Sequence, residues 1–296
     1  MIIKAILHQV YKTVKRPYYW TRSAWPVWYH LLNWRSPKIT SLVGLDSIQQ
    51  RVASELKTNG CTLTHLDELF PGQNQLPVFQ NIARDLMTKA DVKTRKSYLK
   101  QLFDLNPVVD LNDRFVQLAV SDQVLQIVNA YFGLQARLTY YSLDLVEPVG
   151  DAPATMSQRW HRDPEDKLMC TVFLYLTNVG PENGPLHYVK NSQYNGHYGR
   201  IFPQKPPRGY YPPAGAVERA VRPEDIAVFT CRAGTLAFFD TAGLHRGGNA
   251  KSGQRLAFSA RYISRAGYMD DRLRYPENFR EQLALLPPLA QYALRR

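Results

Sequence analysis

The sequence has few cysteines and no pattern that would pair them. Cys61, Cys170 and Cys231 are its three cysteines, and no two of them form a C-x-x-C motif. This excludes a disulfide scaffold, a zinc ribbon and a thioredoxin-type redox site. We therefore expect a reducing compartment, namely the cytoplasm.

Long hydrophobic runs are also missing. No stretch of about 18 consecutive apolar residues occurs, which is the length that a membrane-spanning helix needs. The start of the chain is not typical of a signal peptide, because Lys4 and Gln9 interrupt its apolar stretch and no small-x-small cleavage site follows. With 296 residues, 45% of them hydrophobic, the chain has ample material for a buried core.

Acidic residues are absent from residues 1–40, which contain seven lysines and arginines and four of the five tryptophans. Apolar residues recur at helical spacing between Ile3 and Val14. Three interpretations stay open: a peripheral membrane anchor formed by residues 1–35, a helix that packs on the rest of the chain, or a mitochondrial transit peptide. The net charge of +12 favours an anionic partner. No nucleic-acid-binding motif accompanies it, so no nucleic acid partner is expected.

Residues 41–135 are expected to be mainly helical. In residues 45–60 the apolar positions follow helical spacing, and Gly60 is placed to end that helix. Residues 79–103 and 121–133 are also helix-like, and Ser121 can cap the second of these. These segments are structural by default.

From about residue 136 the pattern changes to short runs rich in β-branched and aromatic residues. The runs span residues 136–148, 167–179, 184–192, 234–241 and 254–263. They predict a mainly antiparallel barrel or sandwich behind a helical N-terminal layer. Residues 194–225, between the runs, are long, proline-rich and basic, which is typical of a functional lid.

The stretch Gln158–Glu165 reads QRWHRDPE. On a strand, residues two apart point to the same face, so His161 and Asp163 can reach one metal ion together. A third ligand is available in His245, which follows a predicted strand in GLHRGGN. Two histidines and one carboxylate on one face of an ion form the facial triad of non-haem Fe(II) oxygenases.

An arginine stands ten residues after His245. Arg255, in GQRLAFSARYI, can bind a carboxylate in bidentate fashion beside such an iron, as the co-substrate 2-oxoglutarate requires. Arg261 has the same strand parity and is the competing candidate. Taken singly, these residues have ordinary structural explanations: the His161–Asp163 pair as surface residues, His245 as a structural hydrogen-bonding residue, and the arginine as an edge residue or ion-pair partner. Their combination predicts a metal site.

The stretches QRWHRD, GLHRGGN, GQRLAFSARY, NGPLHYVKNSQ and RFVQLAVSDQVLQIVNAYFG resemble the phytanoyl-CoA dioxygenase (PhyH)-like branch of the Fe(II)/2-oxoglutarate oxygenases. The likeness covers roughly residues 45–265. It implies a double-stranded β-helix (a cupin-like jelly roll). We therefore divide the chain into a basic segment at 1–40, which lies outside the likeness, and one dioxygenase domain at 41–296 with the lid at about 194–225. It also implies Fe(II), 2-oxoglutarate and O₂ as cofactor and co-substrates, with release of succinate and CO₂.

The resemblance assigns the residues as well. It implies that His161, Asp163 and His245 bind the metal and that Arg255 binds the co-substrate. Gln158 matches a co-substrate residue of some members, although regular strand geometry would turn it away from His161 and requires a bulge. Where members carry a hydroxyl two residues after the distal histidine, this chain has Gly247. Tyr141 and Thr171 are candidates for the missing contact, with core packing as their alternative role.

The substrate is less defined by the sequence. Asp163 stands where related halogenases have a small residue, which favours hydroxylation. Basic residues of the lid, together with Arg159 and Arg162, predict an anionic or lipid-like substrate such as a glycolipid or acyl conjugate, with Arg208 as a further contact. Two alternatives remain: a dioxygenase of a small soluble secondary metabolite, and a non-catalytic jelly-roll binding module.

Overall fold

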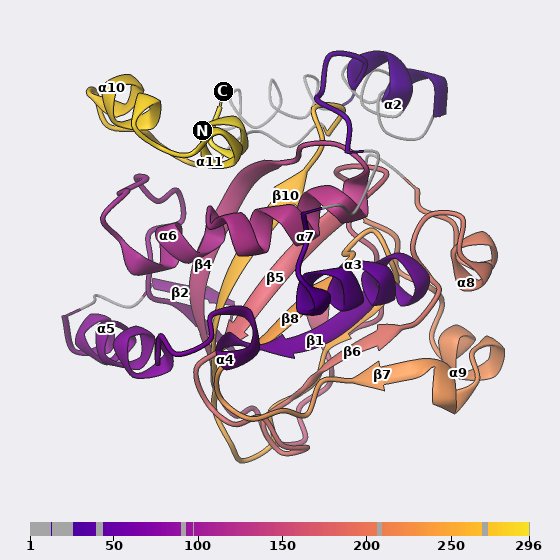
Figure 1. The fold of residues 1–296 in the computed structure, drawn as a ribbon. Helices are drawn as coiled ribbons and strands as arrows, with labels where there is room; N and C mark the ends of the chain where they lie inside the picture. The colour runs from indigo at the N-terminus through magenta and orange to yellow at the C-terminus, as the bar shows by residue number, and fades with distance from the viewer. Residues whose placement is uncertain are drawn as a thin grey trace.

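The computed structural model describes residues 13, 26–39, 44–89, 93–96, 98–205, 209–267 and 272–295. Its centre consists of two antiparallel sheets, one of seven strands in the order β1-β8-β5-β10-β4-β3-β2 and one of three strands in the order β7-β6-β9. Figure 1 shows helices α3, α5, α6 and α7 on the outer side of the large sheet. The fold is the double-stranded β-helix that the sequence predicts, mainly β with a helical N-terminal layer.

The predicted strands are confirmed. The large sheet contains β1 (Cys61–His65), β2 (Lys93–Lys96), β3 (Leu99–Gln101), β4 (Arg137–Val146), β5 (Met169–Tyr175), β8 (Thr235–Phe239) and β10 (Arg255–Ile263), and the small sheet contains β6 (Leu186–Val189), β7 (Ile226–Val228) and β9 (His245–Gly247). β10 lies between β4 and β5, and both pairings are antiparallel. Side chains at alternate positions of these central strands therefore face the helices or the small sheet.

The helical layer begins and ends where its capping residues predict. Helix α3 (Ser47–Asn59) has a capping box at Asp46 and stops at Gly60, which adopts a left-handed conformation. Ser121 caps α7 (Asp122–Phe132), which ends at Gly133. Further helices are α4 (Leu66–Leu69), α5 (Leu76–Lys89), α6 (Arg114–Ala119), α10 (Phe279–Ala284) and α11 (Pro288–Ala293).

The predicted helix over residues 79–103 is wrong in its second half. The helix ends at Lys89, and the chain continues as β2 and β3. β3 pairs with β4, so that Leu99 lies opposite Val146. Pairing at the edge of the sheet outweighs the helical propensity of this lysine-rich stretch, because strand preference depends on the neighbours that tertiary structure supplies.

The main hydrophobic core fills the space between the helices and the outer face of the large sheet. The rings of Phe79, Phe115 and Phe258 pack there in sequence, with centroids 4.9 Å apart in each step. Because β4 and β10 give this core every second residue, their remaining side chains face the interior between the sheets.

The predicted lid is folded. It contains α8 (His197–Ile201), α9 (Ala216–Ala220) and the short helix η2 (Pro223–Asp225). Its apolar side chains form a small core of their own, in which Phe202 and Val217 are packed with Trp160 and Leu244. Figure 1 shows α8 and α9 side by side at one edge of the molecule. The lid therefore packs on the domain through this apolar core.

The end of the basic N-terminal segment packs on the domain. In helix α2 (Pro26–Leu32) Tyr29 is buried, and the Asn33 amide donates a hydrogen bond of 2.9 Å to the Ser264 hydroxyl. Residues 1–12 and 14–25, with most of the predicted membrane anchor, lie outside the described residues, so the anchor stays a prediction. Within the described part of the chain, no helix has the length and apolarity to span a membrane.

Candidate metal centre and cavity

His161, Asp163 and His245 come together at the mouth of the two sheets. Their potential ligand atoms all lie within 4.8 Å of one another. His161 and His245 exchange backbone hydrogen bonds of 2.9 and 3.0 Å, and the Asp163 amide donates to the Thr241 carbonyl at 2.8 Å. The predicted strand at this point is thus reduced to isolated bridges, but the alternation that places His161 and Asp163 on one side holds.

Backbone carbonyls fix both imidazole rings. The Nδ1 atom of His161 lies 2.9 Å from the Arg159 carbonyl, and that of His245 lies 3.0 Å from the Gly243 carbonyl. Because a carbonyl only accepts hydrogen bonds, each Nδ1 carries the proton, and each Nε2 is the ring atom that can bind a metal. Burial, followed by the neighbouring His161, lowers the pKa of His245 to about 3. Its ring is therefore neutral, as a metal ligand must be.

Arg261 stands beside the Asp163 carboxylate. Its Nη2 atom lies 3.2 Å from Asp163 Oδ2, and its Nη1 atom lies 3.3 Å from Glu165 Oε1. Burial raises the pKa of Asp163, but Arg261 and the two histidines outweigh this effect, and the pKa lies below its ordinary value. Burial and the charge of Asp163 raise the pKa of Glu165 to about 7. Arg261 is thus occupied by two carboxylates.

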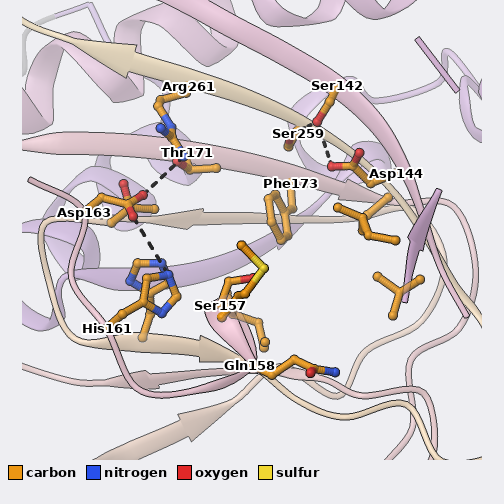
Figure 2. Close-up of a pocket in the computed structure, with 18 of the residues that line it drawn as sticks. Ser142, Asp144, Ser157, Gln158, His161, Asp163, Thr171, Phe173, Ser259 and Arg261 are labelled. Carbon is orange, nitrogen blue, oxygen red and sulfur yellow. Dashed lines mark hydrogen bonds and ion pairs between the residues drawn. The ribbon is translucent and has the colours of Figure 1, made fainter. Parts of the chain in front are cut away.

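A cavity of about 330 Å³ extends from this group between the sheets. Figure 2 shows His161, Asp163 and Arg261 at one end, Phe173 in the middle, and Ser142, Asp144 and Ser259 at the other end. Inward-facing residues of β4, β5 and β10 form one wall, and Leu186, His245 and Gly247 of the small sheet contribute to the opposite wall. The cavity is thus continuous with the three candidate ligands.

Arg255 lines the same cavity, and its guanidinium is buried. It donates a hydrogen bond to the Gly184 carbonyl, and among the described residues no carboxylate forms an ion pair with it. Burial lowers its pKa below the ordinary value. A buried cation without a carboxylate partner is suited to an anionic ligand, because such a charge is costly unless paired. Of the two candidate arginines, Arg255 is therefore the one available to a co-substrate.

Gln158 and Thr171 also face the cavity, and both are almost fully buried. Within the described part of the chain, neither Nε2 of Gln158 nor Oγ1 of Thr171 has a hydrogen-bond partner. Buried polar atoms are normally paired, so these two are suited to bind a ligand. Gln158 reaches the cavity from the short helix η1 (Met156–Gln158), in place of the bulged strand that we expected.

Tyr141 does not face the cavity. Its hydroxyl donates to the Val108 carbonyl at 3.1 Å, and its ring packs against Phe103 and Phe258 in the main core. The predicted co-substrate contact is corrected to the alternative, core packing. Tyr140, one position away and of opposite parity, lines the cavity.

The arginines predicted to meet the substrate are placed elsewhere. Arg162 is 2% exposed and donates to the backbone carbonyls of Ala242, Gly199 and Phe202, so it joins the lid to the domain. Arg159 is exposed and lies over the ring of Tyr211, 5.5 Å from its centroid. Neither lines the cavity. Arg208 lies outside the described residues, so its predicted role stays untested.

Several cavity residues were not predicted. Ser142 donates to Asp144 at 2.7 Å and lies 2.8 Å from the Ser259 hydroxyl, while Tyr211 of the lid stacks on His161 with 15° between the ring planes. Ser142, Asp144 and Ser259 share strand parity with Tyr140, Arg255 and Arg261, and this inward-facing polar series was the available signal.

This fold defines a class: the protein is a non-haem iron, 2-oxoglutarate-dependent enzyme of the double-stranded β-helix type. The family model for phytanoyl-CoA dioxygenase (PhyH) matches residues 83–257, and the chain belongs to that family. A comparison with curated proteins finds no match.

Two solved structures illustrate the likeness of fold. The epimerase SnoN, in complex with Fe³⁺, α-ketoglutarate and nogalamycin RO, has a TM-score of 0.53 and 20% identity over 74% of this chain and 84% of its own. EctD from S. alaskensis, in its apoform, has a TM-score of 0.53 and 13% identity over 83% of this chain and 88% of its own. At these identities the likeness concerns the fold.

Proposed function

We propose that His161, Asp163 and His245 hold the Fe(II) of this oxygenase. The observation that carries the proposal is the convergence of two imidazoles and one carboxylate within 4.8 Å at the end of the cavity. Two nitrogens and one oxygen match the ligand preference of non-haem Fe(II), and such a facial set leaves three coordination positions open. Both rings are held with Nε2 available for the metal.

Arg255 is the residue that would bind the far carboxylate of 2-oxoglutarate. Its buried guanidinium faces the cavity without a carboxylate partner among the described residues, whereas Arg261 is shared by Asp163 and Glu165. Gln158 Nε2 and Thr171 Oγ1 would supply further hydrogen bonds. Unpaired buried donors of this kind stabilise an incoming anion, since their desolvation has already occurred.

When bound, iron and 2-oxoglutarate supply the oxidative decarboxylation that gives succinate and CO₂ and the oxidation of an unactivated C–H bond. The chain orients the reactants and excludes water. Tyr211 covers the face of His161, while Arg162 fastens the lid backbone beside the metal ligands. These contacts limit solvent access at the reacting end of the cavity.

For the substrate we favour a small polar metabolite. The cavity of about 330 Å³ must also hold 2-oxoglutarate, which leaves little space for a long acyl chain. The lid cations Arg200, Lys205 and Arg219 are exposed and do not line the cavity. With Arg255 assigned to the co-substrate and Arg261 paired, Arg272 is the remaining arginine of the lining. These observations favour the secondary-metabolite alternative over an anionic lipid.

The test measures loading and turnover together. Wild-type protein should bind Fe(II) under anaerobic conditions and form succinate slowly from 2-oxoglutarate and O₂ without added substrate. His245→Ala should bind Fe(II) at least about 100-fold more weakly, because losing a ligand exceeds the 10–100-fold cost of losing an outer partner. A wild-type protein that neither binds Fe(II) nor forms succinate is a binding module, and the proposal is then wrong. A mass-shift screen for one added oxygen would identify the substrate.

A membrane contact through the N-terminal segment is a second proposal. In the described part of that segment Trp34 is 65% exposed and Leu31 is 52% exposed, and Arg35 lies over the Trp34 ring at 4.6 Å. Basic and aromatic residues together favour an anionic interface. Deletion of residues 1–25 leaves the packed residues Tyr29 and Asn33 in place and should abolish binding to phosphatidylserine vesicles. Unchanged binding after this deletion would show that the segment is not an anchor.

A further inference from the structure

Arg261 holds a metal-ligand candidate and a neighbouring acid at the same time. Its two terminal nitrogens contact different carboxylates, Nη2 that of Asp163 and Nη1 that of Glu165, as Figure 2 shows for Asp163. The side chain projects from β10, where Arg261 lies opposite Thr171 of β5 and Tyr140 of β4. Strands on both sides therefore fix its backbone, and the planar guanidinium has little freedom to turn.

We propose that Arg261 is a positioning residue that restricts Asp163 to a single metal-coordinating oxygen. The inference rests on the proposed role of His161, Asp163 and His245 as the iron site. Asp163 Oδ1 is directed toward His161, 3.9 Å from its Nε2, whereas Oδ2 is held by Arg261 at 3.2 Å. One oxygen thus faces the other ligands, and the second is kept on the arginine side.

The number of coordination positions explains why this restriction matters. Iron has six positions, and the three protein ligands leave three. When bound through two oxygens, 2-oxoglutarate would take two of these, which would leave one for O₂. A bidentate Asp163 would fill that last position. A carboxylate can bind a cation through one oxygen or two, so the chain needs a group that occupies the second oxygen.

Glu165 completes the arrangement by holding the other side of the guanidinium. Its Oε1 atom lies 3.3 Å from Arg261 Nη1, which prevents the fork from turning toward the metal with both nitrogens. A lysine offers a single point of charge and cannot bridge two carboxylates with defined geometry. The positioning of Asp163 therefore requires an arginine at position 261.

The experiment uses nitric oxide as a probe of the position that O₂ would take. Full-length protein is loaded anaerobically with Fe(II) and 2-oxoglutarate, and nitric oxide binding is followed by electron paramagnetic resonance. The variants are Arg261→Met, Arg261→Lys and the double variant Arg261→Met with Glu165→Gln, which avoids two unpaired buried carboxylates. Arg222→Met is the matched control, because it removes an exposed arginine that pairs with Asp225 away from the cavity.

We expect Arg261→Met and the double variant to bind nitric oxide at least about 10-fold more weakly than wild type, and Fe(II) about 10–100-fold more weakly. Arg261→Lys should fall between, and Arg222→Met should match wild type. Equal nitric oxide and Fe(II) binding in the folded double variant would overturn the positioning role and leave the iron site intact. Tighter Fe(II) binding with unchanged nitric oxide binding would also overturn it, because Arg261 would then only oppose the metal charge. A wild-type protein that binds no Fe(II) would instead refute the proposed function.

Discussion

Tyr211 lies flat against His161, with 5.6 Å between ring centroids and 15° between ring planes. The lid therefore contacts the candidate metal centre through an aromatic ring, and the Arg159 guanidinium lies over the same ring. Such a contact contributes about 0.5–1.5 kcal/mol beyond the burial of area. It connects the lid directly to a proposed ligand.

Removing this ring should uncover the centre. We expect Tyr211→Ala to raise substrate-independent succinate formation several-fold, because water and O₂ then reach the site without the lid. Tyr211→Phe keeps the ring and should behave like wild type. The measurement is 2-oxoglutarate consumption without substrate, with circular dichroism as the control for folding. Equal rates in both variants would contradict a covering role.

Arg255 should determine the affinity for 2-oxoglutarate. A charge-assisted hydrogen-bonded pair contributes about 1.5–3 kcal/mol, so Arg255→Gln should weaken 2-oxoglutarate binding by roughly 10–100-fold. Fe(II) binding should change little, because Arg255 lies at the opposite end of β10 from Arg261, the residue that contacts Asp163. Isothermal titration of each ligand separates the two effects. A loss of Fe(II) affinity alone would assign Arg255 a different role.

A substitution at Gly247 should raise the affinity for 2-oxoglutarate. A Cβ atom at this position would lie 3.7 Å from the Ser157 carbonyl oxygen and 4.0 Å from Arg255 Nη2, which are ordinary contacts. Gly247→Ser would place a hydroxyl beside the proposed co-substrate carboxylate. One added hydrogen bond of about 0.5–1.5 kcal/mol should tighten 2-oxoglutarate binding by roughly 2–10-fold. Gly247→Ala is the control and should not tighten it.

The lid is fastened by a second contact, away from the metal. Glu218 of α9 accepts a hydrogen bond of 3.0 Å from Trp160 Nε1 and lies 3.8 Å from Arg246, which stacks on the Trp160 ring at 4.6 Å. Glu218→Ala should speed tryptic cleavage within residues 194–225, because local opening becomes easier. Glu224→Ala, a change of another exposed lid acid, should leave the cleavage rate unchanged. Similar rates in both variants would mean that the Glu218 contacts do not hold the lid in place.

His187 should make the stability depend on pH. Burial, followed by the charge of Arg246, lowers its pKa to about 4, against about 6.5 in the unfolded chain. As the pH falls from 7.5 to 5.5, the unfolded chain takes up a proton that the folded one does not, so this group lowers the free energy of unfolding.

Urea unfolding of metal-free protein at these two pH values measures the effect. His187→Gln should lose less stability on acidification than wild type, or gain more. The buried Asp240, whose pKa burial raises to about 7, contributes with the opposite sign, but it is present in both proteins and cancels in the comparison. An identical pH dependence in the two proteins would contradict the prediction.

Local sequence patterns were enough to predict the strands β4, β5, β6, β8 and β10, the helices α3 and α7, and the three candidate ligands. Helix ends at Gly60 and Gly133 and the alternation of His161 with Asp163 are local properties, because capping and strand parity depend on neighbouring residues alone. His245 could be found because it follows a predicted strand at the mouth of the sheets.

The contacts of the charged residues could not be predicted from local patterns. Arg255 and Arg261 share strand parity, and the acids that surround Arg261 come from a distant segment. Arginine is a residue type that usually lies on the surface, yet Arg162 is buried and donates hydrogen bonds to carbonyls of the lid. The partners of a long polar side chain depend on segments far apart in the chain, and no periodicity records them. The physical reason is that burial and pairing are properties of the packed fold.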